Sequence, residues 1–197
     1  MFPAFLSRLR RPRTPYLFFD TETDGLPSPR HPFPRLVQLA WILGDADGAV
    51  IDEASVLVRP EGFSIPFDAV EIHGITTERA LAEGIPLADA LSAFAAAAAR
   101  AASVVCHNAE FDCRVVAGEC RRLARPDPLR RLPRVCTMKG STAYCRLPGR
   151  HGWKWPRLSE LHRILFGTGF DGAHDAAVDV RATMRCFHAL RRRKVFP

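Results

Sequence analysis

The sequence contains 197 residues, of which 47% are hydrophobic, and it has a formal net charge of +7 at pH 7. A chain of this length holds one domain with a substantial core, and it contains no run of 18 apolar residues, which excludes a membrane-spanning helix. The basic charge favours a polyanionic partner without proving one. Most of the basic residues are arginine, a bias that a GC-rich genome also produces.

Residues 1–14 are rich in arginine and proline and have no apolar stretch of signal-peptide length. They are predicted to form a basic N-terminal arm, and residues 15–197 a single domain. The six cysteines include no CxxC pair, which argues against a structural zinc site and favours small, buried residues. Free thiols in a chain without an export signal fit a reducing cytoplasm.

The first part of the domain predicts three strands. Residues 16–20 form a short apolar run that ends in a carboxylate. Two further apolar runs, 36–43 and 49–58, are separated by an Asp/Gly turn at 44–48. A turn of this kind between two strands predicts an antiparallel hairpin.

The rest of the sequence predicts mainly helices. The helical segments are 87–100, 109–124, 156–166 and 175–194, and two short strands are expected at 103–106 and 134–137. Residues 138–156 are predicted to be a long, mostly irregular loop, a kind of segment that is often functional in a compact domain. This order of elements predicts an α/β fold in which one mixed sheet is covered by helices.

Three acidic clusters follow these elements. The first is Asp20 and Glu22, at the end of the first strand, where residues two apart point to the same side. Two neighbouring carboxylates repel each other unless a cation lies between them. A hard divalent ion such as Mg²⁺ prefers oxygen ligands and keeps waters that a phosphate can displace. The Asp-x-Glu pattern is common in proteins, so by itself it does not identify a metal site.

The second cluster is His107-Asn-Ala-Glu-Phe-Asp112, directly after the buried strand at 103–106. Here Asn108 is expected to be a helix N-cap and Asp112 to lie near the first turn. A capped helix with an acidic first turn is an equally good interpretation of this segment.

The third cluster is His174-Asp-Ala-Ala-Val-Asp179. On a regular helix, His174 and Asp179 would point about 140° apart. The two side chains can converge only if His174 precedes the helix and Asp175 is its N-cap. A surface histidine beside a capping aspartate is the alternative.

The three clusters in this order resemble the DEDDh 3′–5′ exonucleases, the family of the proofreading epsilon subunit of bacterial DNA polymerase III. The resemblance rests on Phe18-Phe-Asp-Thr-Glu-Thr-Asp-Gly25 and on the two histidine-containing clusters, together with Glu71-Ile-His-Gly-Ile-Thr76. These segments cover nearly the whole chain from residue 16. The His-x-x-x-x-Asp spacing of the third cluster marks the histidine branch of the family.

The resemblance implies a ribonuclease H-like fold, with a five-stranded mixed sheet flanked by helices on both faces. It implies that two Mg²⁺ or Mn²⁺ ions are held by four carboxylates, those of Asp20, Glu22, Asp112 and Asp179. His174 would be the general base, since a histidine side chain accepts a proton near neutral pH. The products would be nucleoside 5′-monophosphates and a strand with a new 3′ hydroxyl, as in two-metal phosphodiester hydrolysis.

The resemblance also implies contacts with the substrate strand. Leu26 matches an apolar wedge against the terminal bases, although an ordinary loop leucine is the alternative, and His73 lies where the family lines the terminal-nucleotide pocket. Asn108 and Phe111 support the end of the strand, although capping and core packing explain them equally well. Basic and aromatic residues mix at 150–157, where stacking and phosphate contacts are one explanation and anchoring of the loop by its tryptophans is another. The substrate-binding residues predicted on these grounds are Thr23, Leu26, His73, Asn108, Phe111, Lys154 and Arg157.

The main prediction is an exonuclease acting on a nucleic-acid strand with a free 3′ end, most simply single-stranded DNA. An RNA exonuclease of the oligoribonuclease or ribonuclease T type is the nearest alternative, because the same site cleaves both backbones. A non-catalytic nucleic-acid-binding subunit and a transposase-like nuclease of the same fold class fit the motifs less well. No membrane association is expected. The chain ends soon after the third cluster, so a stable polymerase partner is not expected either.

Overall fold

The structure is a computed structural model that describes residues 15–29 and 31–196; the predicted basic arm at 1–14 lies outside the described residues. The strands of the main sheet are β1 (Tyr16–Thr23), β2 (Leu36–Gly44), β3 (Val50–Leu57), β4 (Ser103–Cys106) and β5 (Arg134–Cys136). The helices are α1 (Phe67–His73), α2 (Thr77–Glu83), α3 (Leu87–Ala98), α4 (Ala109–Arg122), α5 (Thr137–Cys145), α6 (Leu158–Phe166) and α7 (Ala176–Arg192). Between α5 and α6, β6 (Pro148–Gly149) and β7 (Gly152–Trp153) form a small hairpin.

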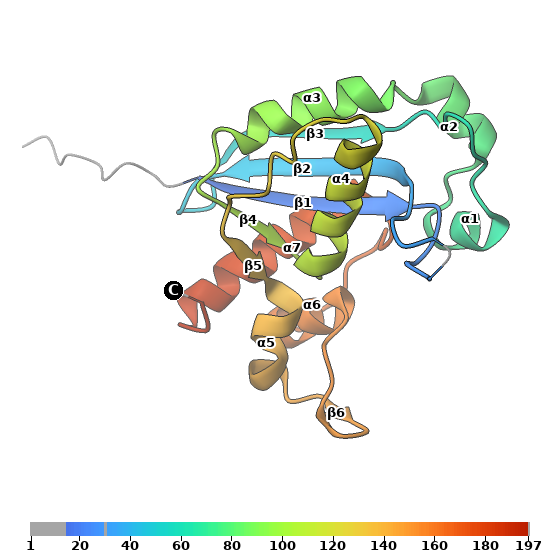
Figure 1. Ribbon diagram of the computed structural model, residues 1–197. Helices are drawn as coiled ribbons and strands as arrows, with labels where there is room; N and C mark the ends of the chain where they lie inside the picture. The colour runs from blue at the N-terminus through green and yellow to red at the C-terminus, as the bar shows by residue number, and fades with distance from the viewer. Residues whose placement is uncertain (1–14, 30, 197) are drawn as a thin grey trace, which may run out of the picture.

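The five strands form one mixed sheet in the order β3-β2-β1-β4-β5 (Figure 1). Strands β1, β2 and β3 are antiparallel neighbours, whereas β4 pairs in parallel with both β1 and β5. The Asp45 side chain accepts hydrogen bonds from the backbone N–H groups of Asp47 and Ala49 and so fixes the β2–β3 turn. The antiparallel hairpin and the five-stranded mixed sheet predicted from the sequence are confirmed.

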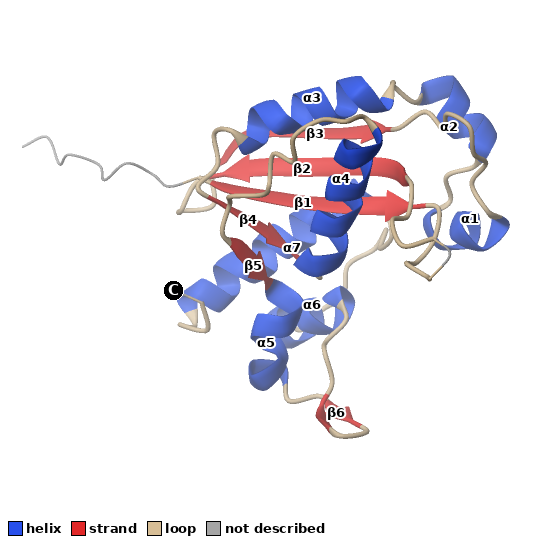
Figure 2. Ribbon diagram, in the orientation of Figure 1, coloured by secondary structure: helices blue, strands red, loops and turns tan. Residues whose placement is uncertain are grey.

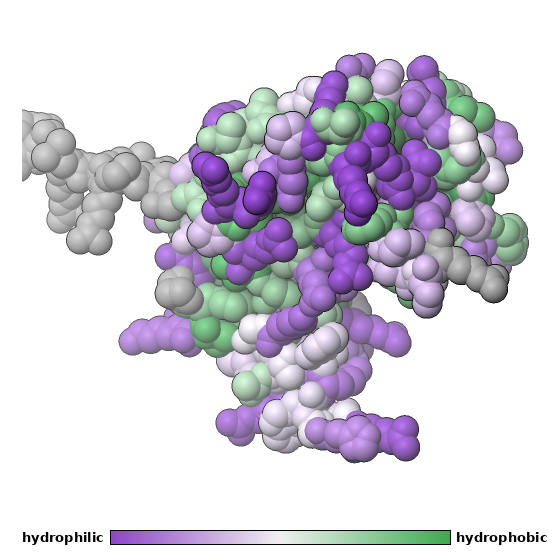
Figure 3. All heavy atoms as spheres, viewed as in Figure 1, coloured by the Kyte–Doolittle hydropathy of each residue, from purple (hydrophilic) through white to green (hydrophobic). Residues whose placement is uncertain are grey.

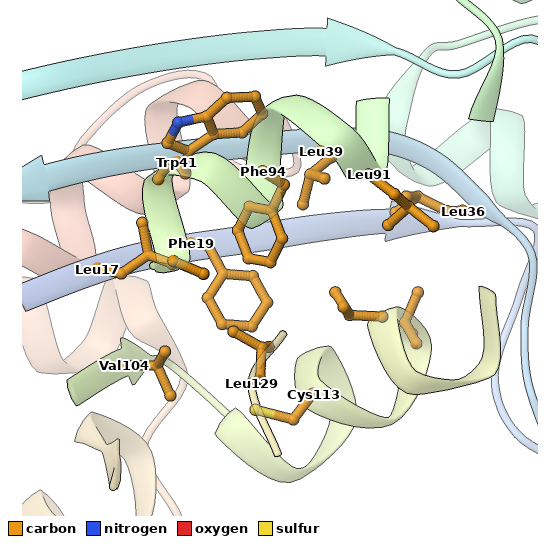
Figure 4. Close-up of a cluster of buried hydrophobic side chains, with 14 of the residues drawn as sticks. Leu17, Phe19, Leu36, Leu39, Trp41, Leu91, Phe94, Val104, Cys113 and Leu129 are labelled. Atoms are coloured by element: carbon orange, nitrogen blue, oxygen red, sulfur yellow. The ribbon is translucent and has the colours of Figure 1, made fainter. Parts of the chain in front are cut away.

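Helices cover both faces of the sheet (Figure 2). On one face, alternate residues of β1 such as Leu17 and Phe19 pack against Phe94 of α3 and Cys113 of α4 (Figure 4). On the other face, Phe18 packs against α7. Burial of both faces explains why all nine residues of β2 are buried and why its sequence shows no alternation of polar and apolar residues.

The loop predicted at 138–156 is the main error of the sequence analysis. Its first part is helix α5, which begins at Thr137. Threonine, glycine and serine are weak helix formers, so the local sequence gives little helical signal. Tertiary packing forms the helix instead: Thr137 and Ser141 are buried, and a side chain on Gly140 would collide with the ring of Phe196. The short helices α1 and α2 were not predicted either.

The prediction of small, buried cysteines is confirmed for Cys106, Cys113 and Cys120, which lie in β4 and α4 within the hydrophobic core. Cys136 and Cys145 are half-buried. Within the described residues, no helix combines the length and the hydropathy that crossing a bilayer requires.

Candidate active site

The first two carboxylates lie at the end of β1, beyond the point where its neighbour stops. Pairing between β1 and β4 ends at Phe18 and Val105, while β1 continues to Thr23. Asp20 and Glu22 therefore have no strand beside them on that side. By strand alternation they share the face of Phe18, which is the face covered by α7. An open position at the carboxyl end of a central strand is where α/β sheets bind ligands.

The third carboxylate, Asp112, comes from the first turn of α4, as predicted. It is only 3% exposed, and its Oδ1 accepts a hydrogen bond of 2.8 Å from Thr21 Oγ1. This bond ties the start of α4 to the end of β1. Asn108 occupies the N-cap position but adopts a left-handed conformation with φ of 99°, and its side chain makes no capping hydrogen bond. The explanation of Asn108 as a capping side chain is therefore wrong.

The fourth carboxylate, Asp179, lies in the first turn of α7 and is bound to the segment before that helix. Asp175 is the N-cap, and its side chain accepts a hydrogen bond from Ala177 N. His174 precedes the helix, with φ of 71°, and its backbone N–H donates to Asp179 Oδ2 at 3.0 Å. The prediction that His174 lies before the helix, and not on it, is confirmed.

These elements bring the acidic side chains together with the histidine. Ligand atoms of Glu22, His174 and Asp179 all lie within 4.8 Å of one another. Asp20 is close enough to Asp112, Asp179 and Glu22 for their charges to raise its pKa. The four carboxylates predicted to act together therefore occupy one place, contributed by β1, α4 and α7.

Burial, together with the close approach of like charges, raises the pKa of every one of these carboxylates. Burial, followed by the charges of Asp112 and Asp179, holds the pKa of Asp20 well above its ordinary value. Burial and the charges of Asp179 and Asp112 raise the pKa of Glu22 to about 8. Burial raises the pKa of Asp112 to about 7 despite the hydrogen bonds from Thr21, and burial also raises the pKa of Asp179. Strongly perturbed carboxyl groups gathered at one place are typical of a functional site.

Three of the predicted substrate contacts lie at the end of β1, in the loop that follows it and at the end of α1. The His73 ring accepts a hydrogen bond from Ile75 N at Nδ1, so Nε2 carries the proton and donates it to Thr23 O. Thr23 Oγ1 donates to Gly25 O at 2.7 Å. Leu26 is 79% exposed, so it is free to contact a ligand. Their roles as substrate contacts stay predictions.

The structure gives the predicted contacts at 150–157 defined partners. Lys154 Nζ donates to Glu160 Oε1 at 2.6 Å, and the backbone N–H of Arg157 donates to the other oxygen of the same carboxylate. Trp153 and Trp155 are 56% and 57% exposed. The alternative that these tryptophans anchor the loop to the core is therefore wrong. Phe111, in contrast, packs against the core while it also lines a surface hollow.

Gln38 on β2 is a residue of this region that the sequence analysis missed. It is buried, and its Oε1 accepts from Ala176 N at 3.1 Å, while its Nε2 donates to Asp175 Oδ1 at 3.2 Å and to Ser55 Oγ at 3.2 Å. One amide thus holds both the N-cap and the first helical residue of α7. The signal that could have found it is a glutamine inside an otherwise apolar strand.

Comparison with known proteins identifies the family of this chain. The sequence profile of the RNase T family, described as Exonuclease, matches residues 17–187. The chain belongs to this family, an exonuclease family of the DEDD superfamily, and it is a nuclease.

Individual relatives support the assignment. A Mycobacterium tuberculosis protein named as a bifunctional exonuclease/endonuclease is 34% identical over 145 residues, which are 73% of this chain and 21% of that protein. E. coli exonuclease I in complex with a dT13 oligonucleotide superposes with a TM-score of 0.76 at 24% identity, over 92% of this chain and 42% of that one. Exonuclease I from Methylocaldum szegediense gives a TM-score of 0.74 at 24% identity, over 92% and 41%. These likenesses confirm the ribonuclease H-like fold, and this chain spans less than half the length of each protein.

Proposed function

We propose that this chain removes nucleotides one at a time from the 3′ end of a nucleic-acid strand, with single-stranded DNA as the preferred substrate. The observation that carries the proposal is the convergence of Asp20, Glu22, Asp112 and Asp179 beside His174. Four carboxylates with raised pKa values have no structural reason to be so close, because their mutual repulsion and burial destabilise the fold.

The donor set fits divalent cations. All four carboxylates offer hard oxygen ligands, which suit Mg²⁺ or Mn²⁺. Asp179 Oδ1 is buried and has no hydrogen-bond partner among the described residues, so one ligand atom is free for a cation. Asp20 is close enough to Asp112, Asp179 and Glu22 for their charges to raise its pKa, and it would hold the cations together with them. When bound, such ions supply Lewis-acid stabilisation of the phosphate and of the leaving oxygen.

The residues of the chain supply orientation and proton transfer. His174 lies at the rim of the cluster, exposed to solvent, and would accept the proton of the attacking water as its oxygen bonds to phosphorus. The bond from phosphorus to the 3′ oxygen then breaks, which releases a nucleoside 5′-monophosphate. Thr21 and the backbone N–H of His174 fix the rotamers of Asp112 and Asp179, so that the carboxylates are oriented before the substrate arrives.

The preference for single-stranded DNA is supported by the structural relatives. E. coli exonuclease I, which shares the fold, has been crystallised with dT13 and dA16 oligonucleotides. The exposed Leu26, four positions after Glu22 in the chain, offers an apolar contact for an unpaired terminal base.

Degradation of a 5′-labelled strand tests the proposal. Wild-type protein with Mg²⁺ or Mn²⁺ is expected to produce a ladder that shortens by single nucleotides and to release 5′-monophosphates, and excess chelator is expected to stop it. DNA and RNA strands of the same sequence are compared side by side, and an Asp89→Asn variant controls for loss of an exposed carboxylate in the first turn of α3. If the RNA strand is degraded faster than the DNA strand, the preferred substrate is RNA and not DNA. Full activity in chelator, or internal cleavage in place of a ladder, would overturn the proposal.

A further inference from the structure

A surface hollow lies beside the carboxylate cluster. Its volume is about 260 Å³, and it is lined by residues from the start of α4, from α5 and from the segment before α6, together with Pro27 from the loop after β1. Asn108 and Phe111, which line it, belong to the same turn as Asp112, and Pro27 directly follows the exposed Leu26. A strand whose 3′ end reaches the carboxylates therefore has this hollow as its next neighbour.

Trp155 provides an aromatic surface at this hollow. Its side chain is 57% exposed, and Lys139 Nζ lies 5.2 Å from the centre of the ring. Aromatic side chains are common in the lining of ligand-binding hollows, so the exposed ring of Trp155 is available to a ligand there. Among the described residues, Trp155 belongs to none of the hydrophobic core clusters.

The backbone that carries Trp155 is fixed on both sides. His107 Nε2 donates to Pro156 O at 3.0 Å, and Lys154 N donates to Leu147 O at 2.9 Å. Burial lowers the pKa of His107 to about 4, so the ring is neutral at physiological pH and keeps the single N–H that this bond requires. The backbone next to Trp155 is thus held by His107, which directly follows β4 and lies in the same segment as Asp112. Such preorganisation reduces the entropy lost on binding.

Two cations line the hollow with Trp155. Lys139 Nζ donates to Glu110 Oε2 at 2.7 Å, and Arg114 lies 3.9 Å from the same carboxylate. The three charges sum to one positive charge, and all three side chains are exposed enough to rearrange. Hydrophilic side chains gather over α4 and at the far end of the β6–β7 hairpin on the face drawn in Figure 3. A phosphate that enters the hollow can replace Glu110 as the partner of Lys139 and Arg114.

We propose that this hollow binds an unpaired nucleotide of the substrate strand on the 5′ side of the scissile bond, with its base stacked on Trp155 and its phosphate held by Lys139 and Arg114. The proposal rests on the proposed function, because it places the rest of the strand that the carboxylate cluster cleaves. A base in a duplex is already stacked and paired, so the subsite selects single strands. Stacking on an aromatic side chain is tolerant of sequence, because every base has a π-face.

Two substrates of different length separate the subsite from the catalytic centre. The thymidine 5′-monophosphate ester of p-nitrophenol occupies the carboxylate cluster alone, whereas a dT10 strand also reaches the hollow. Trp155→Ala is expected to raise KM for dT10 about tenfold, the value of one base–aromatic stack, with kcat little changed and the ester hydrolysed at the wild-type rate. Trp155→Phe is expected to restore most of the affinity.

Trp153→Ala is the matched control, because Trp153 is equally exposed, lies two residues away and does not line the hollow. It is expected to leave KM for dT10 unchanged. Equal effects of the two alanine variants, no effect of Trp155→Ala, or equal losses on both substrates would overturn the subsite.

Binding measured without turnover keeps the two proposals separate. In an Asp20→Asn background, the dissociation constant of fluorescent dT10 is expected to rise about tenfold when Trp155→Ala is added. This result would establish the subsite even if wild-type protein cleaved neither substrate, an outcome that would refute only the proposed function. An unchanged dissociation constant would refute the subsite even in a fully active enzyme.

Salt dependence tests the phosphate contacts. Lys139→Ala and Arg114→Ala are each expected to reduce the slope of log K against log salt by about 0.7 for a single strand. Glu110→Gln is expected to tighten binding of dT10, since it removes the competing anion. Weaker binding in Glu110→Gln, or slopes that do not change, would exclude the phosphate contacts.

Discussion

The carboxylate cluster and the Trp155 hollow are neighbours of opposite electrostatic character. In the cluster, four like charges converge from β1, α4 and α7, and one carboxylate oxygen is buried without a partner among the described residues. In the hollow, Glu110 lies between two cations, and every charged group is largely exposed. The cluster holds unbalanced negative charges, whereas the charges of the hollow are mostly paired and leave one net positive charge.

This difference separates two tasks. Charges that are buried and fixed by the main sheet and helices stabilise a transition state, because they do not reorganise during the reaction. Exposed charges with replaceable partners bind a backbone of phosphates weakly and reversibly, which suits a strand that must move after each cleavage. Substitutions in the cluster should therefore change kcat by orders of magnitude, while those around the hollow should change affinity by smaller factors.

Asp20→Asn should have the largest effect, because the charges of the three other carboxylates all act on Asp20. Loss of a metal ligand removes several kcal/mol of transition-state stabilisation, so activity should fall by at least about 10³-fold. Single-turnover assays in Mg²⁺ and in Mn²⁺ measure this loss. Activity within tenfold of wild type would show that Asp20 is not a metal ligand.

The same variant should be more stable than the wild type in chelator. Burial and mutual repulsion raise the pKa of Glu22 to about 8 and that of Asp112 to about 7, above the values near 4 expected in the unfolded chain. A raised carboxyl pKa contributes stability below about pH 4, and this stability is lost as the pH rises through about 8.

The melting temperature of the chelated wild type should therefore fall between pH 5 and pH 8, and that of Asp20→Asn should fall less. A change of 1 kcal/mol shifts the melting temperature of such a domain by about 2–4 °C. Added Mg²⁺ should raise the melting temperature of the wild type at pH 8, since a cation binds the charged carboxylates of the folded state. A wild type that gains stability with pH in chelator would contradict the electrostatic account of the cluster.

His174→Ala should have the next largest effect. Removal of a general base typically costs about 10² to 10⁴ in kcat. His151→Ala, which removes an exposed histidine from the β6–β7 hairpin, is the matched control. Calorimetric titration with Mn²⁺ distinguishes two roles, because the His174 ring is also near enough to Glu22 and Asp179 to bind a metal. If His174→Ala binds Mn²⁺ as tightly as the wild type, His174 acts as the general base. If the variant loses affinity for Mn²⁺, His174 is a metal ligand.

Gln38→Leu should reduce kcat about tenfold, with KM nearly unchanged. The glutamine touches neither substrate nor cation, but its amide holds the start of α7 and thereby Asp179 and His174. Loss of a partner that orients a metal ligand typically lowers metal affinity or activity by about 10- to 100-fold. Ser55→Ala removes the third hydrogen bond of Gln38 and should cost less than Gln38→Leu. A larger effect on KM than on kcat would show a binding role instead.

The smallest effect should come from Lys154→Ala combined with Arg157→Ala. Glu160 already pairs with Lys154, so the positive charge of Lys154 is partly neutralised. The affinity for dT10 should therefore fall only a few-fold. The metal dependence of hydrolysis should not change. A tenfold or larger loss would move the main phosphate contacts from the Trp155 hollow to this segment.

The sequence alone determined the sheet and the identity of the catalytic candidates. Apolar runs such as 16–20 and 36–43 are local patterns that predict strands. The turn at 44–48 contains Asp45, whose side chain accepts hydrogen bonds within the turn, so the hairpin could be predicted as well. The acidic motifs followed too, because each lies where a strand ends or a helix begins. The location of His174 before α7 could be deduced from helix geometry and the capping aspartate.

Only the tertiary structure decided the features that depend on distant residues. Helix α5 forms because Gly140 packs against Phe196, a partner 56 positions along the chain, and weak local propensity gives no sign of it. Gln38 reaches Asp175 and Ala176 across the fold, and the Trp155 ring lies near Lys139 of α5. Local propensity and motif spacing describe near neighbours in the sequence, whereas burial, pKa shifts and binding hollows depend on which distant side chains the core brings together.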